Sequence, residues 1–331
     1  MRIGKFPLCC YIVGAIAPRS DAEPAYQPMS LRFWKQISAA FRRLNPESVI
    51  LESQRPFSVA LVGSGAEAGG MEDWLAPAEL SPAKQEQARK RLFRISLPIH
   101  PRDHALLLSA TTVRFAGNTA AEDLRALSRD YFYFHSKQPE VTASEALEGH
   151  PELALALARH FPPFRDPVVA GLIKTVSLEN SAFAILSALP NVIPNPLELP
   201  WAFGEFASDT AILTANQVRL ALLIAAASDS AVGFAEQKGQ VASILGSALG
   251  WRALARELAG KVPAGGGLVV KGLIAYAGTY TVGLGLARFH RLGSHLTRAE
   301  KKQAYRDALH SGRAAVEKLA RRALTGRGER T

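Results

Sequence analysis

The stretch that decides the fold is VPAGGGLVVKGLIAYAGTYTVGLGLA, residues 262–287. It contains one charged residue, Lys271, and its last 16 residues contain none. A segment this apolar must avoid water, either in lipid or between other helices. It leads into a cationic end, because residues 288–331 hold 12 Lys/Arg against 4 Asp/Glu, a net charge of +8 out of +10 for the chain. An apolar, glycine-rich segment followed by a basic one is typical of membrane-contacting proteins.

Small residues recur at every fourth position on the apolar segment and on the helix expected before it. These candidate helix-packing residues are Ala275, Thr279, Gly283 and Ala287, together with Gly246 and Gly250. Such spacing lets helix backbones approach closely, as in membrane helix pairs. The 16 uncharged residues span only about 24 Å as a helix, short of a roughly 30 Å hydrocarbon core. Two interpretations therefore remain: membrane insertion or deep association, and a tightly packed helical core in water.

The basic segment predicts a surface for anionic lipid or for an acidic partner. The expected contact residues are Arg288, Arg291, Arg298, Lys301, Lys302, Arg321 and Arg322. Nucleic acid is not expected, because the segment offers only Phe289 and Tyr305 for stacking on bases. Thr297 and Glu300 have the spacing of a capping box and predict the start of a last helix.

The composition and pattern of the chain predict an α+β protein in four parts. Residues 1–28 are predicted to be a leader, which is either disordered or the result of a mispredicted start codon. In the second case Met29 is the first residue. Residues 29–46 form a basic amphipathic helix, 47–140 a small α/β domain, and 141–331 a larger, mostly helical, membrane-associated domain. The adjacent pair Cys9 and Cys10 provides no disulfide framework.

Local signals place the elements within these parts. Strands are expected at residues 57–62, 92–97 and 106–108, with a helix opening at Ser81-Pro82. Thr142 and Glu145 predict a capping box for the first helix of the helical domain. Further helices are expected at residues 166–189, 209–227, 240–259 and 268–289.

A glycine-rich turn follows the first expected strand, in VALVGSGAEAGG (59–70). The candidate nucleotide-binding residues are Gly63, Gly65, Gly69 and Gly70. A phosphate loop needs Lys and Ser/Thr after its second glycine, but here Met71 and Glu72 take those places. The site is therefore expected to be degenerate, without efficient hydrolysis of GTP or ATP.

No other motif predicts catalysis, so we expect a protein that is not an enzyme and carries no cofactor. His100 and His104 are four residues apart, but Pro101 lies between them and disfavours one helix that carries both. We therefore expect no metal site and no catalytic nucleophile.

Two longer stretches carry a resemblance to a known family. They are GWRALARELAGKVPAGGGLVVKGLIAYAGTYTVGLGLARF (250–289) and NSAFAILSALPNVIP (180–194). They resemble a bacterial family of unknown function typified by YcjF-like membrane proteins, over roughly residues 165–320, and PFSVALVGS (56–64) is similar to the strand and loop that open a GTPase domain. The resemblance implies membrane association and a P-loop GTPase or ATPase as partner, and it transfers no catalytic residue.

Three functional hypotheses follow from these observations. The first is a non-enzymatic accessory protein or adaptor on the cytoplasmic side of the inner membrane, peripheral or integral, that works with a P-loop GTPase or ATPase. The second is a GTPase-related protein that binds nucleotide without efficient hydrolysis. The third is a soluble helical interaction domain that binds acidic partners through its basic end.

Overall fold

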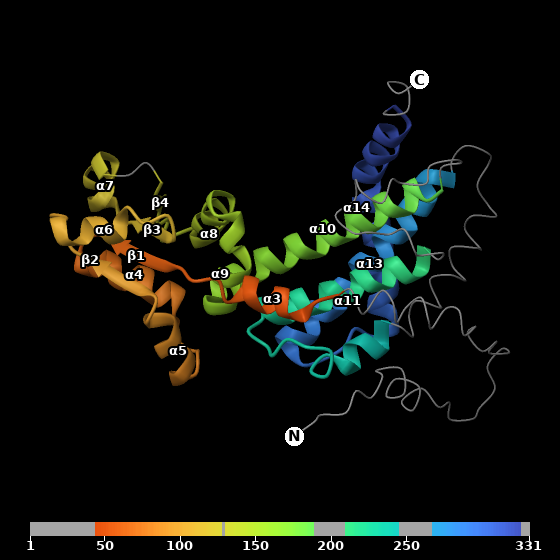
Figure 1. The fold of residues 1–331 in the computed structure, drawn as a ribbon, viewed down its shortest axis with the longest axis horizontal. Coiled ribbons are helices and arrows are strands. Elements are labelled where there is room, and N and C mark those ends of the chain that lie inside the picture. The colour runs from red at the N-terminus through yellow and green to blue at the C-terminus, as the bar shows by residue number, and fades with distance from the viewer. Residues whose placement is uncertain (1–43, 128–129, 189–208, 245–266, 326–331) are drawn as a thin grey trace. The chain divides into compact units, whose positions relative to one another are not determined.

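The computed structural model describes residues 44–127, 130–188, 209–244 and 267–325 (Figure 1). The protein is α+β, as the sequence predicts, with a parallel sheet in the N-terminal half and helices in the C-terminal region. It divides into two compact units. The sheet unit comprises residues 47–171 and 225–232, and the helical unit comprises residues 44–46 and the described parts of 172–224 and 233–331. The sheet unit thus extends past residue 140, where the sequence suggested a boundary, to Gly171.

The sheet unit is built on four parallel strands in the order β2-β1-β3-β4. The strands are β1 (Ser58–Val62), β2 (Leu92–Ile95), β3 (Thr112–Ala116) and β4 (Phe132–Tyr133). Its helices are α3 (Pro46–Ser53), α4 (Gly65–Leu75), α5 (Pro82–Arg89), α6 (His104–Leu107), α7 (Ala121–Leu127), α8 (Pro139–Gly149) and α9 (Ala154–His160). Short 3-10 turns lie at Pro101–Asp103, Asn118–Ala120, Pro151–Leu153 and Pro162–Phe164.

Alternate residues of the strands bury opposite faces of the sheet, as the period of a strand requires. On one face Ala60 and Val62 belong to a core cluster with Leu107 and Leu124. An aromatic cluster is centred on Trp74 of α4, whose ring lies 5.5 Å from that of Phe115. The predicted strand 57–62 and the helix that opens at Ser81-Pro82 are both confirmed, as β1 and α5.

The strand expected at residues 106–108 is wrong. Leu106 and Leu107 are the last two residues of α6 and Leu108 follows as its C-cap, whereas the strand is β3, a few residues later. The charge of Arg114 conceals β3 in the sequence, because a central strand is normally apolar. Arg114 is nevertheless buried, since its guanidinium donates to the backbone carbonyls of Leu107, Ser109 and Asp130.

The capping box expected at Thr142 and Glu145 is also wrong. Helix α8 begins three residues earlier, at Pro139, after Gln138 as its N-cap. The Thr142 hydroxyl instead accepts a hydrogen bond from the backbone N–H of His135 and donates one to the Tyr133 carbonyl, both at 2.9 Å. It therefore joins α8 to the short edge strand β4.

The helical unit contains most of α10 (Arg165–Leu186) and α11 (Asp209–Ala227), with all of α13 (Gly267–Leu292) and α14 (Arg298–Thr325). The predicted helices at 209–227 and 268–289 are confirmed, and so is the capping box of the last helix. Residues 238–244 are helical and are the described part of the helix expected at 240–259. The expected leader, the helix at 29–46 up to residue 43, and Gly246 and Gly250 lie outside the described residues.

Helix α13 is antiparallel to both α14 and α10. Gly272 lies against Ile185 of α10 and Val316 of α14, whereas Gly283 lies against Ile173, and Gly285 faces Leu296. The helices approach closely at these glycines, because an added Cβ at Gly283 would lie 2.7 Å from the Ile173 side chain. From Gly272 to His290 no residue of α13 is exposed, so this helix forms the core of the helical unit.

In the described parts of the chain, two segments are long and apolar enough to cross a membrane, Pro162–Leu186 and Leu268–Leu292, each with a mean hydropathy of 1.3. Their length and composition are compatible with membrane association. In the most apolar 18 residues of each segment, 50% and 44% of the residues, respectively, are buried within the protein itself.

Candidate functional site

The predicted nucleotide-binding glycines do not form one loop. Gly63 follows the last residue of β1 and is buried, and Gly65 is the first residue of α4. Gly69 and Gly70 lie in the second turn of the same helix. The turn between strand and helix is therefore only Gly63-Ser64, which is much shorter than a phosphate loop.

The two positions that a phosphate loop would use for chemistry have structural roles instead. Met71 is fully buried in the sheet-unit core. Glu72 accepts ion pairs from Arg94 at 2.6 Å and from Arg89 at 3.0 Å, which join α4 to β2 and α5. Neither residue faces the N-terminus of α4.

The side chain of Glu67 lies at the N-terminus of α4 and bridges two loops. Its carboxylate accepts hydrogen bonds from the Ser64 backbone N–H and hydroxyl, both at 2.9 Å. It also accepts a bond from the Thr119 N–H at 3.2 Å and another from the Thr119 hydroxyl. Ser64 and Thr119 follow the adjacent strands β1 and β3, so the carboxylate fastens these two strand ends together.

The electrostatics of this arrangement favour the ionised carboxylate. Desolvation alone would raise its pKa, but the hydrogen bonds from Thr119 and Ser64 together outweigh that effect and lower the pKa of Glu67 to about 2. The helix N-terminus adds to the same preference, because its free N–H groups carry partial positive charge. Glu67 is therefore an anion at every pH at which the protein is expected to work.

The second candidate site is the solvent-exposed surface of α14 on all its sides, which we call the α14 cationic face. Helix α14 carries eight Lys/Arg and three acidic residues. Its stripe of Tyr305, Ala308, Gly312 and Val316 is buried. Among the described residues, seven of its basic side chains have no ion-pair partner, and all seven are exposed: Arg298, Lys301, Lys302, Arg306, Lys318, Arg321 and Arg322.

Two predicted contact residues from α13 are placed differently. Arg288 is half-buried and pairs with Glu300 at 2.6 Å, which ties the end of α13 to the start of α14. The backbone N–H of Thr297, the Arg288 guanidinium and the Thr297 hydroxyl lower the pKa of Glu300 to about 2. Arg291 is exposed at the end of α13.

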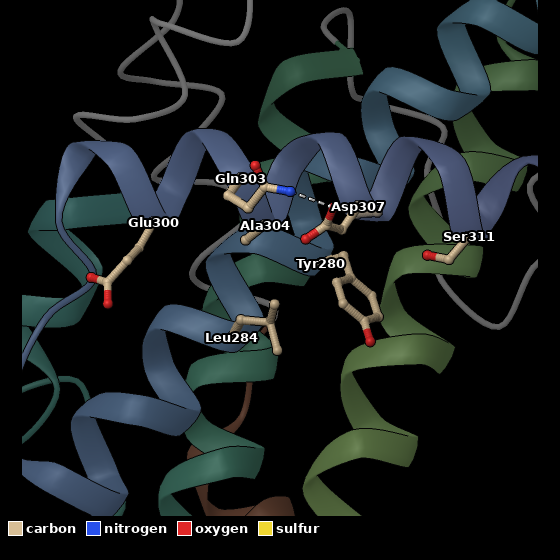
Figure 2. Close-up of a pocket in the computed structure, with 8 residues that line it drawn as sticks. Tyr280, Leu284, Glu300, Gln303, Ala304, Asp307 and Ser311 are labelled. Carbon is tan, nitrogen blue, oxygen red and sulfur yellow. Dashed lines mark hydrogen bonds between the residues drawn. The ribbon is translucent and has the colours of Figure 1, made fainter.

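A pocket of about 420 Å³ lies between α13 and α14 (Figure 2). Its apolar side is formed by Leu284 and Ala304, and Tyr280 stands beside them. Glu300 and Asp307 line the polar side, where Asp307 accepts a hydrogen bond from the Gln303 amide at 2.7 Å. Since Glu300 already pairs with Arg288, the pocket offers a single uncompensated carboxylate.

Buried polar residues connect α13 to α10 and α11. The Asn180 amide donates to the Thr279 hydroxyl at 2.8 Å, and Asn216 donates to Asn180 at 2.8 Å. Gln217 reaches the same Thr279 hydroxyl at 3.3 Å. Thr279, predicted as a packing residue, thus also fixes the register of three helices, while Ala275 and Ala287 are half-buried on the same helix.

No group of three or more His, Cys, Asp or Glu that could hold a metal ion occurs among the described residues. No protein-family model matches the chain, and neither the curated proteins nor the solved structures contain a significant match to it. The resemblance to YcjF-like proteins therefore stays a prediction.

The sequence interpretation missed Glu67, Thr119 and Gly117 as site residues. A signal for Glu67 was present, because Ser64-x-x-Glu67 has the spacing of a capping box and the structure forms one. Thr119 and Gly117 could not be placed, because the strand before them had been expected several residues too early.

Proposed function

We propose that this chain is a non-enzymatic, membrane-associated accessory protein that binds an anionic bilayer surface through the α14 cationic face. The observation that carries the proposal is the set of seven exposed basic side chains without an ion-pair partner among the described residues. Lys and Arg close to an anionic surface each contribute about 1 kcal/mol of binding. At about 100° per residue the seven side chains lie at different angles around α14, so only some of them contact a flat surface at once, and this supports reversible attachment.

The packing of α13 favours attachment to the surface over insertion. Helix α13 has α10 on one side and α14 on another, and α14 is strongly charged on its outer side. Among the described residues of the helical unit, the exposed large hydrophobic side chains are Leu292 and Leu324, both near helix ends. Since the described helices of this unit expose no continuous apolar belt, their insertion would carry uncompensated charges into hydrocarbon.

Vesicle binding tests the proposal. The full chain is sedimented with vesicles of phosphatidylglycerol and phosphatidylcholine, and with vesicles of phosphatidylcholine alone. We expect binding to the anionic vesicles at low salt, with little binding to the neutral ones. Binding should weaken steeply between about 50 and 300 mM salt, because the Debye length shortens over this range.

A matched pair of variants locates the binding surface. One variant reverses three charges on α14, Lys302→Glu, Arg306→Glu and Arg321→Glu. The control reverses three exposed charges elsewhere, Arg55→Glu, Lys137→Glu and Lys238→Glu, and so has the same net charge. We expect the α14 variant to lose at least about tenfold in affinity and the control to lose much less. Equal losses, or equal binding to neutral vesicles, would contradict the proposal.

A soluble interaction domain for an acidic protein is the second candidate, and the enclosed position of α13 favours it. This function uses the same cationic face but predicts no binding to anionic vesicles near 150 mM salt. Binding to anionic vesicles that is still measurable near 150 mM salt supports the membrane function, and its loss at that salt supports the second candidate. The P-loop partner implied by the resemblance stays a prediction, which a pull-down with the intact chain would test.

A further inference from the structure

The carboxylate of Glu67 lies between Ser64 and Thr119, in a space that we call the crevice, at the edge of the sheet where parallel α/β sheets bind their ligands. From β1 the chain leads through α4 to β2 on one side of the sheet, and from β3 it leads through α7 to β4 on the other. The carboxyl ends of β1 and β3 therefore lie at a point where the strand order reverses. Ligands of open α/β sheets bind at such points, with anionic groups at the N-terminus of the following helix.

Two glycines make room for the Glu67 carboxylate. A Cβ atom added at Gly117 would lie 2.5 Å from Cδ of Glu67, and one at Gly63 would lie 2.9 Å from its Oε2. Neither glycine has a positive φ angle, so the backbone would accept another residue at both positions. Both positions need glycine because the Glu67 carboxylate occupies the space that a side chain would fill.

We infer that this crevice is an anion site whose anion is the protein's own Glu67, so that the wild-type sheet unit is closed to phosphate compounds. Removal of the Glu67 carboxylate should then open a site for a tetrahedral oxyanion, held by the N–H groups and hydroxyls of Ser64 and Thr119. Within the described residues these are the four donors that reach the carboxylate now. The inference is independent of the membrane function.

Thermal unfolding of the full chain tests the anion site, with inorganic phosphate as the probe and NaCl of equal ionic strength as the reference. We expect Glu67→Ala to lower the melting temperature by about 3–6 °C, and phosphate to restore at least about 2 °C of this loss. Wild type and Glu67→Gln, whose side chain still fills the crevice, should respond to phosphate no more than to NaCl. A phosphate response in wild type, or the same response in all three proteins, would overturn the inference.

A double-mutant cycle provides a test that needs no ligand. Gly117→Ala should lower the melting temperature of wild type by several degrees, because the new Cβ displaces the carboxylate. In the Glu67→Ala background the same change should cost at most about 1 °C, since the clashing atoms are gone. If Glu67→Ala does not fold, Glu67→Ser supplies the background. Additive losses would show that Gly117 is needed for another reason, and the inference would fail.

Discussion

At the scale of single residues, His160 links the stability of the sheet unit to pH. Burial lowers the pKa of His160 to about 4, and the charges of Arg91 and Arg159 act in the same direction. Its ring packs against Phe57, with the centroids 5.9 Å apart. The remaining charged groups near the ring are Asp229, which favours the protonated form, and Arg165, which opposes it.

This shift predicts a loss of stability in weak acid. The unfolded chain takes up the proton near pH 6.5, whereas the folded protein does so only near pH 4. The unfolding free energy should therefore fall as the pH drops from about 6.5 to 4. We expect His160→Phe, which keeps the ring contact, to remove about 1–2 kcal/mol of this fall, allowing for partial exposure of the ring. Urea titrations at pH 7, 5.5 and 4.5 measure it, and parallel pH curves for both proteins would contradict it.

At the scale of secondary-structure elements, the contact between α13 and α14 depends on Gly312. A Cβ at this position would overlap the ring of Tyr276. That ring is stacked on Tyr280, with centroids 5.7 Å apart and an interplanar angle of 21°, so it has little freedom to move aside. The close approach of the two helices is therefore fixed by the absence of a side chain.

Two glycine-to-alanine changes separate packing from helix propensity. Gly171 lies on α10 with open space around its Cβ position, so Gly171→Ala should stabilise the protein by about 0.5–1 kcal/mol. Gly312→Ala gains the same propensity but should destabilise by about 1–2 kcal/mol net, because overpacking exceeds that gain. Equilibrium denaturation of both variants measures the difference. Stabilisation by both changes would mean that α13 and α14 are not in close contact.

The sequence predicted those elements whose signals are local. The apolar run that became α13 and the Thr297–Glu300 capping box that opens α14 needed no tertiary information. Strand β3 was missed because Arg114 makes its pattern look exposed, and only the fold supplies the carbonyls that satisfy that charge. The role of Glu67 was hidden for the same reason, since its second loop lies 52 residues further along the chain.

At the scale of the whole molecule, the apolar segments must avoid water, whereas the positive charge must stay in contact with water or with an opposite charge. The two apolar segments Pro162–Leu186 and Leu268–Leu292 are about half buried inside the protein, so much of their surface already avoids water without lipid. The positive charge is concentrated in one segment, because residues 288–331 carry a net charge of +8 out of +10 for the chain. This distribution supports the proposed attachment to an anionic surface rather than insertion into the hydrocarbon.

Fractionation of cells that express the full chain tests this balance. At low ionic strength we expect the protein in the membrane pellet, and a wash with about 0.5 M NaCl should release most of it, because screening removes the attraction at that concentration. The variant with Lys302, Arg306 and Arg321 changed to Glu should be recovered in the soluble fraction without any wash, and the control with Arg55, Lys137 and Lys238 changed to Glu should not. No detergent should be needed to release any of the three proteins from the membrane pellet. If the wild-type protein stays in the pellet through both high salt and alkaline carbonate, α13 leaves its packed position and enters the bilayer. Electrostatic attachment to the membrane surface would not survive both treatments.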